Sequence, residues 1–409
     1  MKESTTHFGK TDRRKFLKSV SLGLAWNSLP QSITFDPKTD RGTVTIKNIR
    51  FENGIVIEAS DGTIGYFKGS ESQDSQKLKT FIPAIKELLV GKDPFDPKLE
   101  GEMFWEAIYP GKARLYEKGI DPLTGLNIAN KSRGSRHTIT GQIFIAFSTV
   151  DIALWDLRAK LRGQPAYRII GNADREKIPV YWRPGEATKG LTEACQRARE
   201  AFDSGYKYQK WYFTKSAKDG KEGFKENVEL VRSLREELPD ANLMFDNHSI
   251  RYYDDVNYSI ELCKAISVYN PFWVEEPICP EHLEGYKRIK GETGVTIAGG
   301  EHLYTKWPVK AFLDNKCLDY VQSDPIWCGG ISEWLKICDL VNQYPGVKMV
   351  PHITSPWIVA PHCVASQSVN LCPILEYNFE GGRQALANAI EQTSEGNRIM
   401  KMPVEPGIS

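Results

Sequence analysis

Residues 242–302 contain three short apolar runs that each end in a carboxylate residue: Asn242-Leu-Met-Phe-Asp246, Phe272-Trp-Val-Glu275 and Val295-Thr-Ile-Ala-Gly-Gly-Glu301. Runs of this length and content are typical of strands that are buried on both faces of a parallel sheet. Helix-like stretches separate the three runs. The segment therefore predicts consecutive βα units whose acidic residues lie at one edge of a sheet.

The same alternation of strand and helix extends on both sides of this segment, from residue 178 to residue 377. Helices are expected between the strands, for example at 191–204, 226–238, 254–268, 331–343 and 357–369. Eight parallel strands favour a closed barrel, and an open doubly wound sheet is the alternative, although no G-x-G-x-x-G follows the first strand. The predicted strands are Ile178–Trp182, Tyr206–Phe213, Asn242–Asn247, Phe272–Glu276, Val295–Gly299, Tyr320–Ser323, Met349–His352 and Pro373–Tyr377.

The part of the chain before the barrel predicts strands followed by helices, the α+β pattern. Residues 43–67 alternate in strand fashion, and Asn53-Gly54 between two such runs indicates a tight hairpin. Helices are expected at 76–91, with Pro83 as a kink or boundary, at 98–117, and at 141–162, which is apolar on most sides and therefore buried.

The first 42 residues are interpreted as a leader outside the fold. They read Lys10-Thr-Asp-Arg-Arg-Lys-Phe-Leu-Lys18 and continue into a short apolar stretch. Arg13-Arg14 before such a stretch resembles a twin-arginine export signal, which predicts a periplasmic protein. The alternative is a basic leader on a cytoplasmic protein.

Composition excludes several classes of protein. The chain has 409 residues, 53 Lys+Arg against 52 Asp+Glu and 41% hydrophobic residues. This apolar content excludes wholesale disorder, and the balanced charge gives no reason to expect nucleic acid as a partner. No apolar stretch is long enough to predict a membrane-spanning helix. The eight cysteines form no C-x-x-C pair and are interpreted as buried free thiols, with metal or redox roles as the alternative.

Polar residues recur at or just past the ends of the predicted strands. Their successive numbers differ by 23 to 36, about one βα unit, so each returns to the rim where a parallel barrel places its active site. Any one of these carboxylates, taken alone, could instead be a helix N-cap. The set consists of Lys210, Asp246, Glu275, Glu301, Asp324, His352 and Glu376.

Three of these residues predict a metal site. Asp246, Glu275 and Glu301 follow consecutive strands, and three converging anions repel one another unless a cation lies between them. Oxygen ligands favour a hard cation such as Mg²⁺, whereas zinc prefers histidine or thiolate. The adjacent Glu276 and His302 are expected to support the ligands, and His302 is also a candidate for substrate binding.

The remaining rim residues predict acid–base chemistry. A carboxylate beside a histidine fixes its tautomer and raises its basicity, so Asp324 and His352 form a candidate general base. Lys210 is expected to act as a base or to hold a substrate carboxylate. Glu376 is a candidate hydrogen-bond donor to an enolate, on the condition that its pKa is raised.

These residues resemble the enolase superfamily, in its mandelate racemase/muconate-lactonising branch. The segment from Ala146 to Gly171, with Ser-Thr-Val-Asp-Ile-Ala-Leu-Trp-Asp at its centre, is similar to one signature of that branch. Asp246-x-His248 with Val274-Glu-Glu-Pro277 is similar to another. The resemblance implies an α+β capping domain and a modified (β/α)7β barrel, a TIM-like α/β fold. It also implies Mg²⁺ bound by Asp246, Glu275 and Glu301, and removal of the proton α to a carboxylate through an enediolate.

The implied organisation is a leader (1–42), the capping domain (43–170), the barrel (171–378) and a C-terminal segment that returns to the capping domain (379–409). The family's specificity loop is replaced by the tight turn at residues 51–54. Either the pocket is unusually open, or another segment closes it, for which the basic stretch 131–137 and a neighbouring subunit are the candidates. The alternative for that stretch is a solvated loop. A homo-oligomer is expected by analogy with the family.

Within the branch, four short segments look closest to acid-sugar dehydratases such as the L-rhamnonate dehydratases. This likeness implies loss of water from an aldonate-type acid to give a 2-keto-3-deoxy sugar acid. A cycloisomerase or epimerase of a related or anhydro sugar acid is the second reading, and a non-catalytic sugar-acid binding barrel is a remote third. The segments are 210–213, 300–302, 327–330 and 350–352.

The chain departs from the branch at two positions near the predicted base. Tyr212 stands where many members have a second lysine, so it becomes a candidate substrate contact and a racemase is disfavoured. Lys210 and Glu376 are expected to contact substrate as well. His248 matches a position that some relatives use for a second catalytic histidine, and its alternative is a structural role.

Overall fold

The computed structural model describes most of the chain from residue 44 onward. The expected leader, nearly all of the helix expected at 98–117, the basic stretch 131–137 and His248 lie outside the described residues. These expectations stay predictions. The described residues are 44–69, 82–96, 99, 139–171, 173–184, 190–247, 255–280, 282–354, 358–378 and 389–408.

A three-stranded antiparallel sheet begins the described chain, in the order β1 (Ile46–Phe51), β2 (Ile55–Ala59) and β3 (Ile64–Phe67). The predicted hairpin is confirmed, because Phe51 pairs with Ile55 across a turn in which Asn53 has a φ of 53°. Helix α3 (Ile82–Leu89) follows and contacts β1. Of the helix expected at 76–91, residues 76–81 lie outside the described residues, and Pro83 lies in the first described turn of α3.

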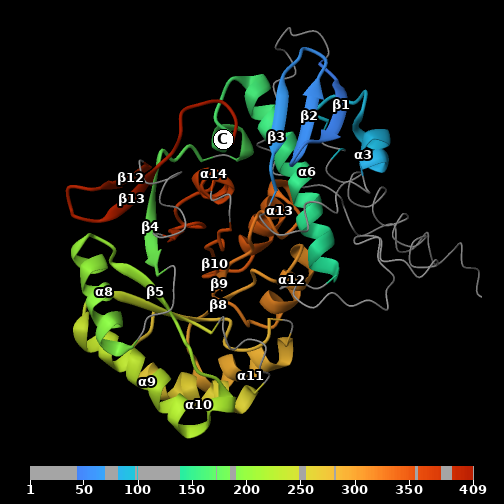
Figure 1. Ribbon diagram of the computed structural model, residues 1–409. Coiled ribbons are helices and arrows are strands. Elements are labelled where there is room, and N and C mark those ends of the chain that lie inside the picture. The colour runs from blue at the N-terminus through green and yellow to red at the C-terminus, as the bar shows by residue number, and fades with distance from the viewer. Residues whose placement is uncertain are drawn as a thin grey trace, which may run out of the picture. The chain divides into compact units, whose positions relative to one another are not determined.

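Helix α6 (Ile139–Arg162) is buried on all sides along its middle, as its sequence predicts. Every residue from Ile145 to Ala159 is buried. The helix packs against β2 and β3 on one side, as Figure 1 shows, and contacts the barrel helix α13 (Ile331–Val341) on another. Such double coverage explains why the helix has no polar face.

Asp151 of α6 ties this helix to the barrel. Its carboxylate accepts hydrogen bonds from the Ser332 backbone N–H at 3.0 Å and from the Ser332 hydroxyl at 2.5 Å. The Trp155 indole N–H donates to the same hydroxyl oxygen at 2.9 Å. Gly330 has a φ of 95°, and a Cβ there would lie 2.3 Å from the Asp151 carboxylate, so only glycine allows this approach.

Replacing Asp151 with alanine is expected to lower the free energy of unfolding by about 2–3 kcal/mol, because it leaves buried donors of Ser332 without their acceptor. Urea denaturation measures the change. Asp203→Ala, which removes an exposed ion pair with Arg199, is the matched control and should change stability by less than about 1 kcal/mol. Equal effects of the two substitutions would contradict this account of α6.

All eight predicted barrel strands are present and pair in parallel. The ladders run in chain order from β4 to β10, and the last strand, β11, pairs with the first, β4. This cyclic order is that of a barrel and lacks the reversal of a doubly wound sheet, so the predicted fold class is confirmed. The strands are β4 (Lys177–Arg183), β5 (Tyr208–Tyr212), β6 (Asn242–Asp246), β7 (Trp273–Glu275), β8 (Ile297–Gly299), β9 (Tyr320–Val321), β10 (Lys348–Met349) and β11 (Leu375–Asn378).

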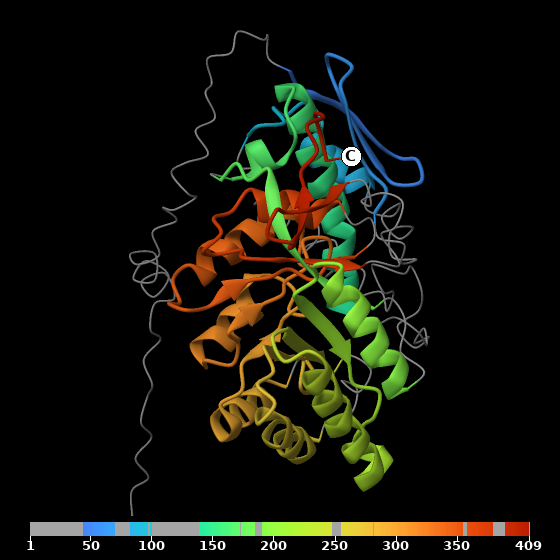
Figure 2. The same cartoon turned by 90° about the vertical axis from the view of Figure 1, so that its left-hand side faces the viewer.

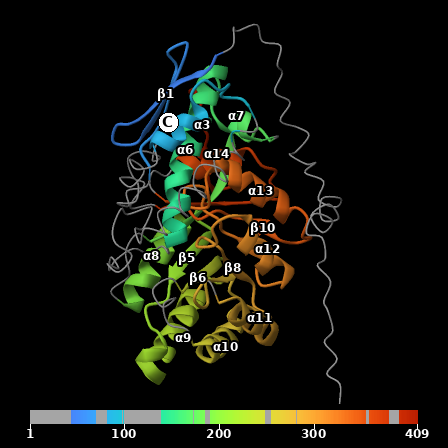
Figure 3. The same cartoon turned by 90° about the vertical axis from the view of Figure 1, so that its right-hand side faces the viewer.

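The helices lie outside the strands, as Figures 1, 2 and 3 show. The helix expected at 226–238 starts earlier, at Gly220, because a capping box at Ser216 and Asp219 begins a 3₁₀ turn, η2 (Ala217–Asp219), that leads into it. The helices are α7 (Tyr167–Ile170), α8 (Leu191–Asp203), α9 (Gly220–Glu237), α10 (Val256–Ser267), α11 (Leu283–Thr293), α12 (Lys306–Asp314), α13 and α14 (Val359–Ala365).

The C-terminal segment contacts both parts of the fold. Strands β12 (Ile390–Gln392) and β13 (Arg398–Lys401) form a hairpin, and β13 pairs antiparallel with the first residues of β4. Further on, the Ile408 N–H donates to Asp156 of α6 at 2.9 Å. The domain boundaries proposed from the sequence stay a prediction.

His362 joins the C-terminal segment to α7. Its Nδ1 accepts the Tyr167 backbone N–H at 3.1 Å, and its Nε2 lies 3.2 Å from the Ile408 carbonyl oxygen. These partners require a neutral ring with the hydrogen on Nε2. Burial lowers the pKa of His362 from 6.5 to about 4.

Stability is therefore expected to fall as the pH falls from about 6.5 to about 4, because only the unfolded chain binds a proton at this histidine in that range. The loss should reach about 3 kcal/mol at the lower end. His362→Gln is expected to remove this part of the pH dependence in urea denaturation curves recorded at several pH values. An unchanged slope in the variant would contradict the assignment.

All eight cysteines are free thiols, as predicted, and six of them are buried, whereas Cys195 and Cys279 are half-buried. Among the described residues, no helix combines the length and the apolar content needed to span a bilayer.

Candidate active site

The period of two along the strands places four of the predicted residues, Asp246, Glu275, His352 and Glu376, in one layer inside the barrel. Six residues form an apolar cluster of their own, separate from the main core: Tyr181, Met244, Trp273, Ala298, Val350 and Ile374. Side chains two positions apart on a strand face the same side. The positions two further along are Arg183, Asp246, Glu275, Gly300, His352 and Glu376.

Lys210 lies among three carboxylates of this layer. Its Nζ is 2.6 Å from Glu275 Oε1, 3.2 Å from Glu376 Oε2 and 3.4 Å from Asp246 Oδ2. Burial alone would lower the pKa of Lys210, but the surrounding carboxylates outweigh it and raise the pKa well above its ordinary value. The side chain is therefore a permanent cation rather than a base.

Glu275 uses both of its oxygens within the protein. Oε1 pairs with Lys210, and Oε2 accepts hydrogen bonds from Gln322 at 2.7 Å and from the Trp273 indole at 3.2 Å. Burial and the charge of Asp246 raise the pKa of Glu275 to about 8. Burial, together with the charges of Glu301 and Glu276, raises the pKa of Asp246 to about 6 against the opposing effect of Lys210.

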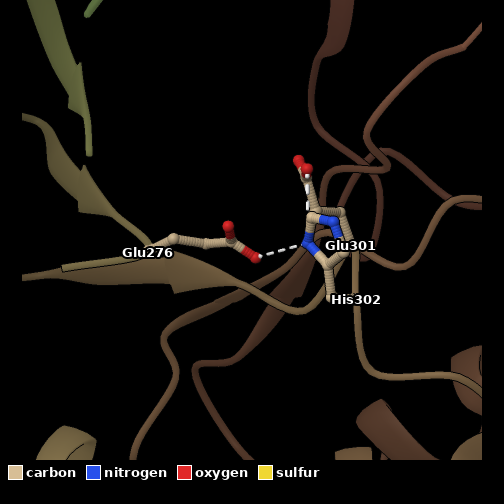
Figure 4. A group of neighbouring side chains, drawn as sticks. All are labelled: Glu276, Glu301 and His302. Carbon is tan, nitrogen blue, oxygen red and sulfur yellow. Dashed lines mark hydrogen bonds and ion pairs between the residues drawn. The ribbon is translucent and has the colours of Figure 1, made fainter. Parts of the chain in front are cut away.

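Glu276, Glu301 and His302 form a second group, shown in Figure 4. One ligand atom from each lies within 4.8 Å of the others. His302 Nδ1 is 3.1 Å from Glu276 Oε1 and 3.4 Å from Glu301 Oε1. Glu276 has a φ of 40°, which turns the chain just past the end of β7. The structure thus brings Glu276 and His302 into contact with the predicted ligand Glu301.

Asp324 and His352 form the predicted carboxylate–histidine pair. His352 Nδ1 lies 2.9 Å from Asp324 Oδ2, while His352 Nε2 is 3.7 Å from Glu301 Oε2. The Ile326 backbone N–H holds Asp324 Oδ1 at 2.7 Å. The Trp327 ring lies between two histidines, 4.7 Å from the His352 ring and 5.5 Å from the His302 ring. The pair therefore faces the carboxylate cluster through Nε2.

Glu376 could donate a hydrogen bond to an enolate only with a raised pKa, and its pKa is not raised. Burial alone would raise its pKa, but Lys210 and Arg183 outweigh burial and lower the pKa below its ordinary value. Its Oε2 also accepts a hydrogen bond from the Tyr181 hydroxyl at 2.8 Å. Glu376 is therefore an anion that bridges two cations, and the idea that it donates a hydrogen bond to an enolate is corrected.

Arg183, Tyr181 and Gln322 are site residues that sequence reasoning missed. Arg183 forms an ion pair with Glu376 and donates to the Tyr212 hydroxyl at 2.7 Å. A signal was present, since Arg183 directly follows the first predicted strand, Ile178–Trp182, as the other rim residues lie at or just past theirs. Arg183 directly precedes Pro184-Gly185, which reads as a loop.

The donor set fits a hard divalent cation. Six carboxylates of this part of the described chain are buried, whereas Lys210 and Arg183 are its only permanent cations. Burial raises the pKa values of Asp246 and Glu275, and the charges of the neighbouring carboxylates raise them further. A dication with oxygen ligands would offset this excess of negative charge. The six are Asp246, Glu275, Glu276, Glu301, Asp324 and Glu376.

Comparisons with known proteins agree on the fold of this chain. The family model for the enolase C-terminal domain-like proteins matches residues 193–409. An L-rhamnonate dehydratase of Saccharopolyspora erythraea is 33% identical over 218 residues, which are 53% of this chain and 52% of the relative. An arabinonate dehydratase of Saccharolobus solfataricus is 27% identical over 301 residues, 73% and 71% of the two chains.

The match to the first of these relatives thus spans about half of that protein's length. Among solved structures, the rhamnonate dehydratase from Gibberella zeae complexed with Mg superposes with a TM-score of 0.65 and 26% identity, covering 87% of this chain and 78% of the other.

Proposed function

Since the chain belongs to the enolase C-terminal domain-like family, we propose that it is a Mg²⁺-dependent acid-sugar dehydratase, a hydro-lyase. The substrate would be an aldonate-type acid. It would lose the proton α to its carboxylate, pass through an enediolate and lose its β-hydroxyl, which gives a 2-keto-3-deoxy sugar acid. The observation that carries the proposal is the Asp324–His352 pair, whose second ring nitrogen, Nε2, lies 3.7 Å from Glu301 Oε2 in the buried carboxylate group.

His352 is the proposed general base. Asp324 holds Nδ1–H, so the lone pair on Nε2 takes the α-proton, and Asp324 stabilises the imidazolium that forms. The same proton, or one from another group, then leaves with the β-hydroxyl as water. His248 stays a candidate partner in this step, from outside the described residues.

Lys210 and Tyr212 are the proposed contacts for the substrate's anionic end. Lys210 keeps its charge because Glu275 and Glu376 surround it, so it would hold a carboxylate rather than remove a proton. Burial raises the pKa of Tyr212 to about 12, so its hydroxyl keeps its hydrogen at neutral pH. His302 is a further proposed contact.

Asp246, Glu275 and Glu301 are the residues that we propose hold Mg²⁺, with Glu276 and His302 beside Glu301. When bound, the ion would polarise the substrate carboxylate and make the α-proton more acidic. The carboxylates themselves bring the opposing charge that a buried dication requires.

A library of mono- and diacid sugars with Mg²⁺, monitored for 2-keto acids by semicarbazide, tests the proposal. Formation of a 2-keto-3-deoxy acid supports it. No product, together with deuterium uptake at the α-carbon in D₂O, would instead favour a cycloisomerase or epimerase. Binding without exchange would favour a sugar-acid binding barrel.

We also propose that residues 1–42 carry a twin-arginine signal and that the barrel works as a homo-oligomer. The support is Arg13-Arg14 ahead of a short apolar stretch, and the family resemblance. Export of a reporter fused to this leader, and its loss when both arginines become lysine, tests the first point. Light scattering of the purified protein tests the second.

A further inference from the structure

Arg183 has a place in the site that the proposed reaction leaves unexplained. It is the last residue of β4, two positions beyond Tyr181 of the inner apolar layer. Its side chain is 14% exposed and lies against two groups of the site. Nη1 donates to the Tyr212 hydroxyl at 2.7 Å, and Nε forms an ion pair with Glu376 Oε1.

The contact with Arg183 determines the hydrogen-bonding role of the Tyr212 hydroxyl. A guanidinium has only donors, so the phenol oxygen must be the acceptor in this bond. The phenol hydrogen therefore points toward an acceptor other than Arg183. Tyr212 is half-buried at the end of β5, and it pairs in register with Asp246 of β6, next to the carboxylate cluster.

Glu376 fixes Arg183 from the other side. Its Oε1 pairs with Arg183, while its Oε2 is held by Lys210 and Tyr181. The negative charge of this carboxylate thus offsets the repulsion between Arg183 and Lys210. Arg183 contacts Tyr212 and Glu376 through two different nitrogens, Nη1 and Nε, that are fixed in one plane, whereas lysine has only one nitrogen and no such fixed spacing.

We propose that Arg183 is a positioning residue that makes the Tyr212 hydroxyl an obligate hydrogen-bond donor to a carboxylate oxygen of the bound acid. This inference deepens the proposed function and rests on it. Lys210 and Tyr212, two positions apart on β5, then present donors from the same face of the strand. Such a rim favours an anion, because both groups donate toward the bound acid.

Calorimetric titration with oxalate in MgCl₂ tests the proposal without turnover. Oxalate is a planar dianion with the charge and shape of an enediolate acid. Arg183→Met and Tyr212→Phe are each expected to weaken oxalate binding about tenfold. The double variant should be no weaker than Tyr212→Phe alone, because Arg183 acts through that hydroxyl. Losses that multiply in the double variant, or no loss in Tyr212→Phe, would overturn the proposal.

Two further variants keep the result interpretable. Arg232→Met removes an arginine that pairs with the surface residues Glu229 and Glu236 of α9, and it should leave oxalate binding unchanged. Arg183→Lys keeps the charge beside Glu376 and serves if Arg183→Met fails to fold. It should lose affinity like Arg183→Met, and full retention would overturn the proposal. Failure of the proposed function would appear separately, as no product from wild-type enzyme that still binds oxalate.

Discussion

Replacing His352 with asparagine is expected to lower the rate of dehydration by about 10²–10⁴. Asparagine retains a side chain that can hydrogen-bond to Asp324, but it cannot accept a proton at the position of Nε2. The loss should fall on kcat rather than on KM, because the group acts only when the proton moves. The measurement is the rate of 2-keto acid formation from the sugar acid that the wild-type enzyme accepts.

His282→Asn is the matched control for this substitution. His282 accepts the Gly285 N–H at 2.8 Å as the N-cap of α11, where asparagine is a good replacement. Its activity should equal that of the wild-type enzyme. Deuterium uptake at the α-carbon gives a second readout, since His352→Asn should lose exchange together with dehydration. Retained exchange in this variant would show that another group removes the α-proton.

Replacing Lys210 with methionine is expected to lower the free energy of unfolding by about 3–5 kcal/mol. The substitution nearly preserves the volume, but it removes the cation from among Glu275, Glu376 and Asp246. These buried carboxylates would then repel one another in a medium that screens them poorly. Urea denaturation in EDTA measures the effect, because a bound dication would partly replace the missing charge.

Lys310→Met is the control for Lys210→Met. Lys310 pairs with Asp314 at 2.6 Å on the surface of α12, with both side chains nearly half exposed. This substitution should cost less than about 1 kcal/mol. A similarly small cost for Lys210→Met would contradict the view that its charge holds the carboxylate layer together.

The barrel could be predicted because its strands are buried on both faces. Each strand therefore appears in the sequence as a short apolar run, and each polar residue at its end stands out, as Glu275 does after Trp273-Val274. The regular spacing of one βα unit then placed Asp246, Glu275 and His352 at one rim. In the structure they occupy one layer inside the barrel.

Contacts between distant strands could not be predicted in the same way. The charge state of Glu376 depends on Arg183, which lies at the opposite end of the barrel sequence but on the neighbouring strand. The contact of His302 with Glu276 likewise joins residues of two different strand ends. Sequence spacing predicts which residues share a rim, but it does not predict which of them pair there.

The central claim is that the rim carboxylates hold one divalent cation beside His352. Anomalous diffraction from crystals of the protein grown with Mn²⁺ in place of Mg²⁺ tests it most directly. The account predicts a single strong peak bounded by Asp246, Glu275 and Glu301, within reach of the His352 side of the site. No peak at these residues, or a peak at another place in the molecule, would contradict it.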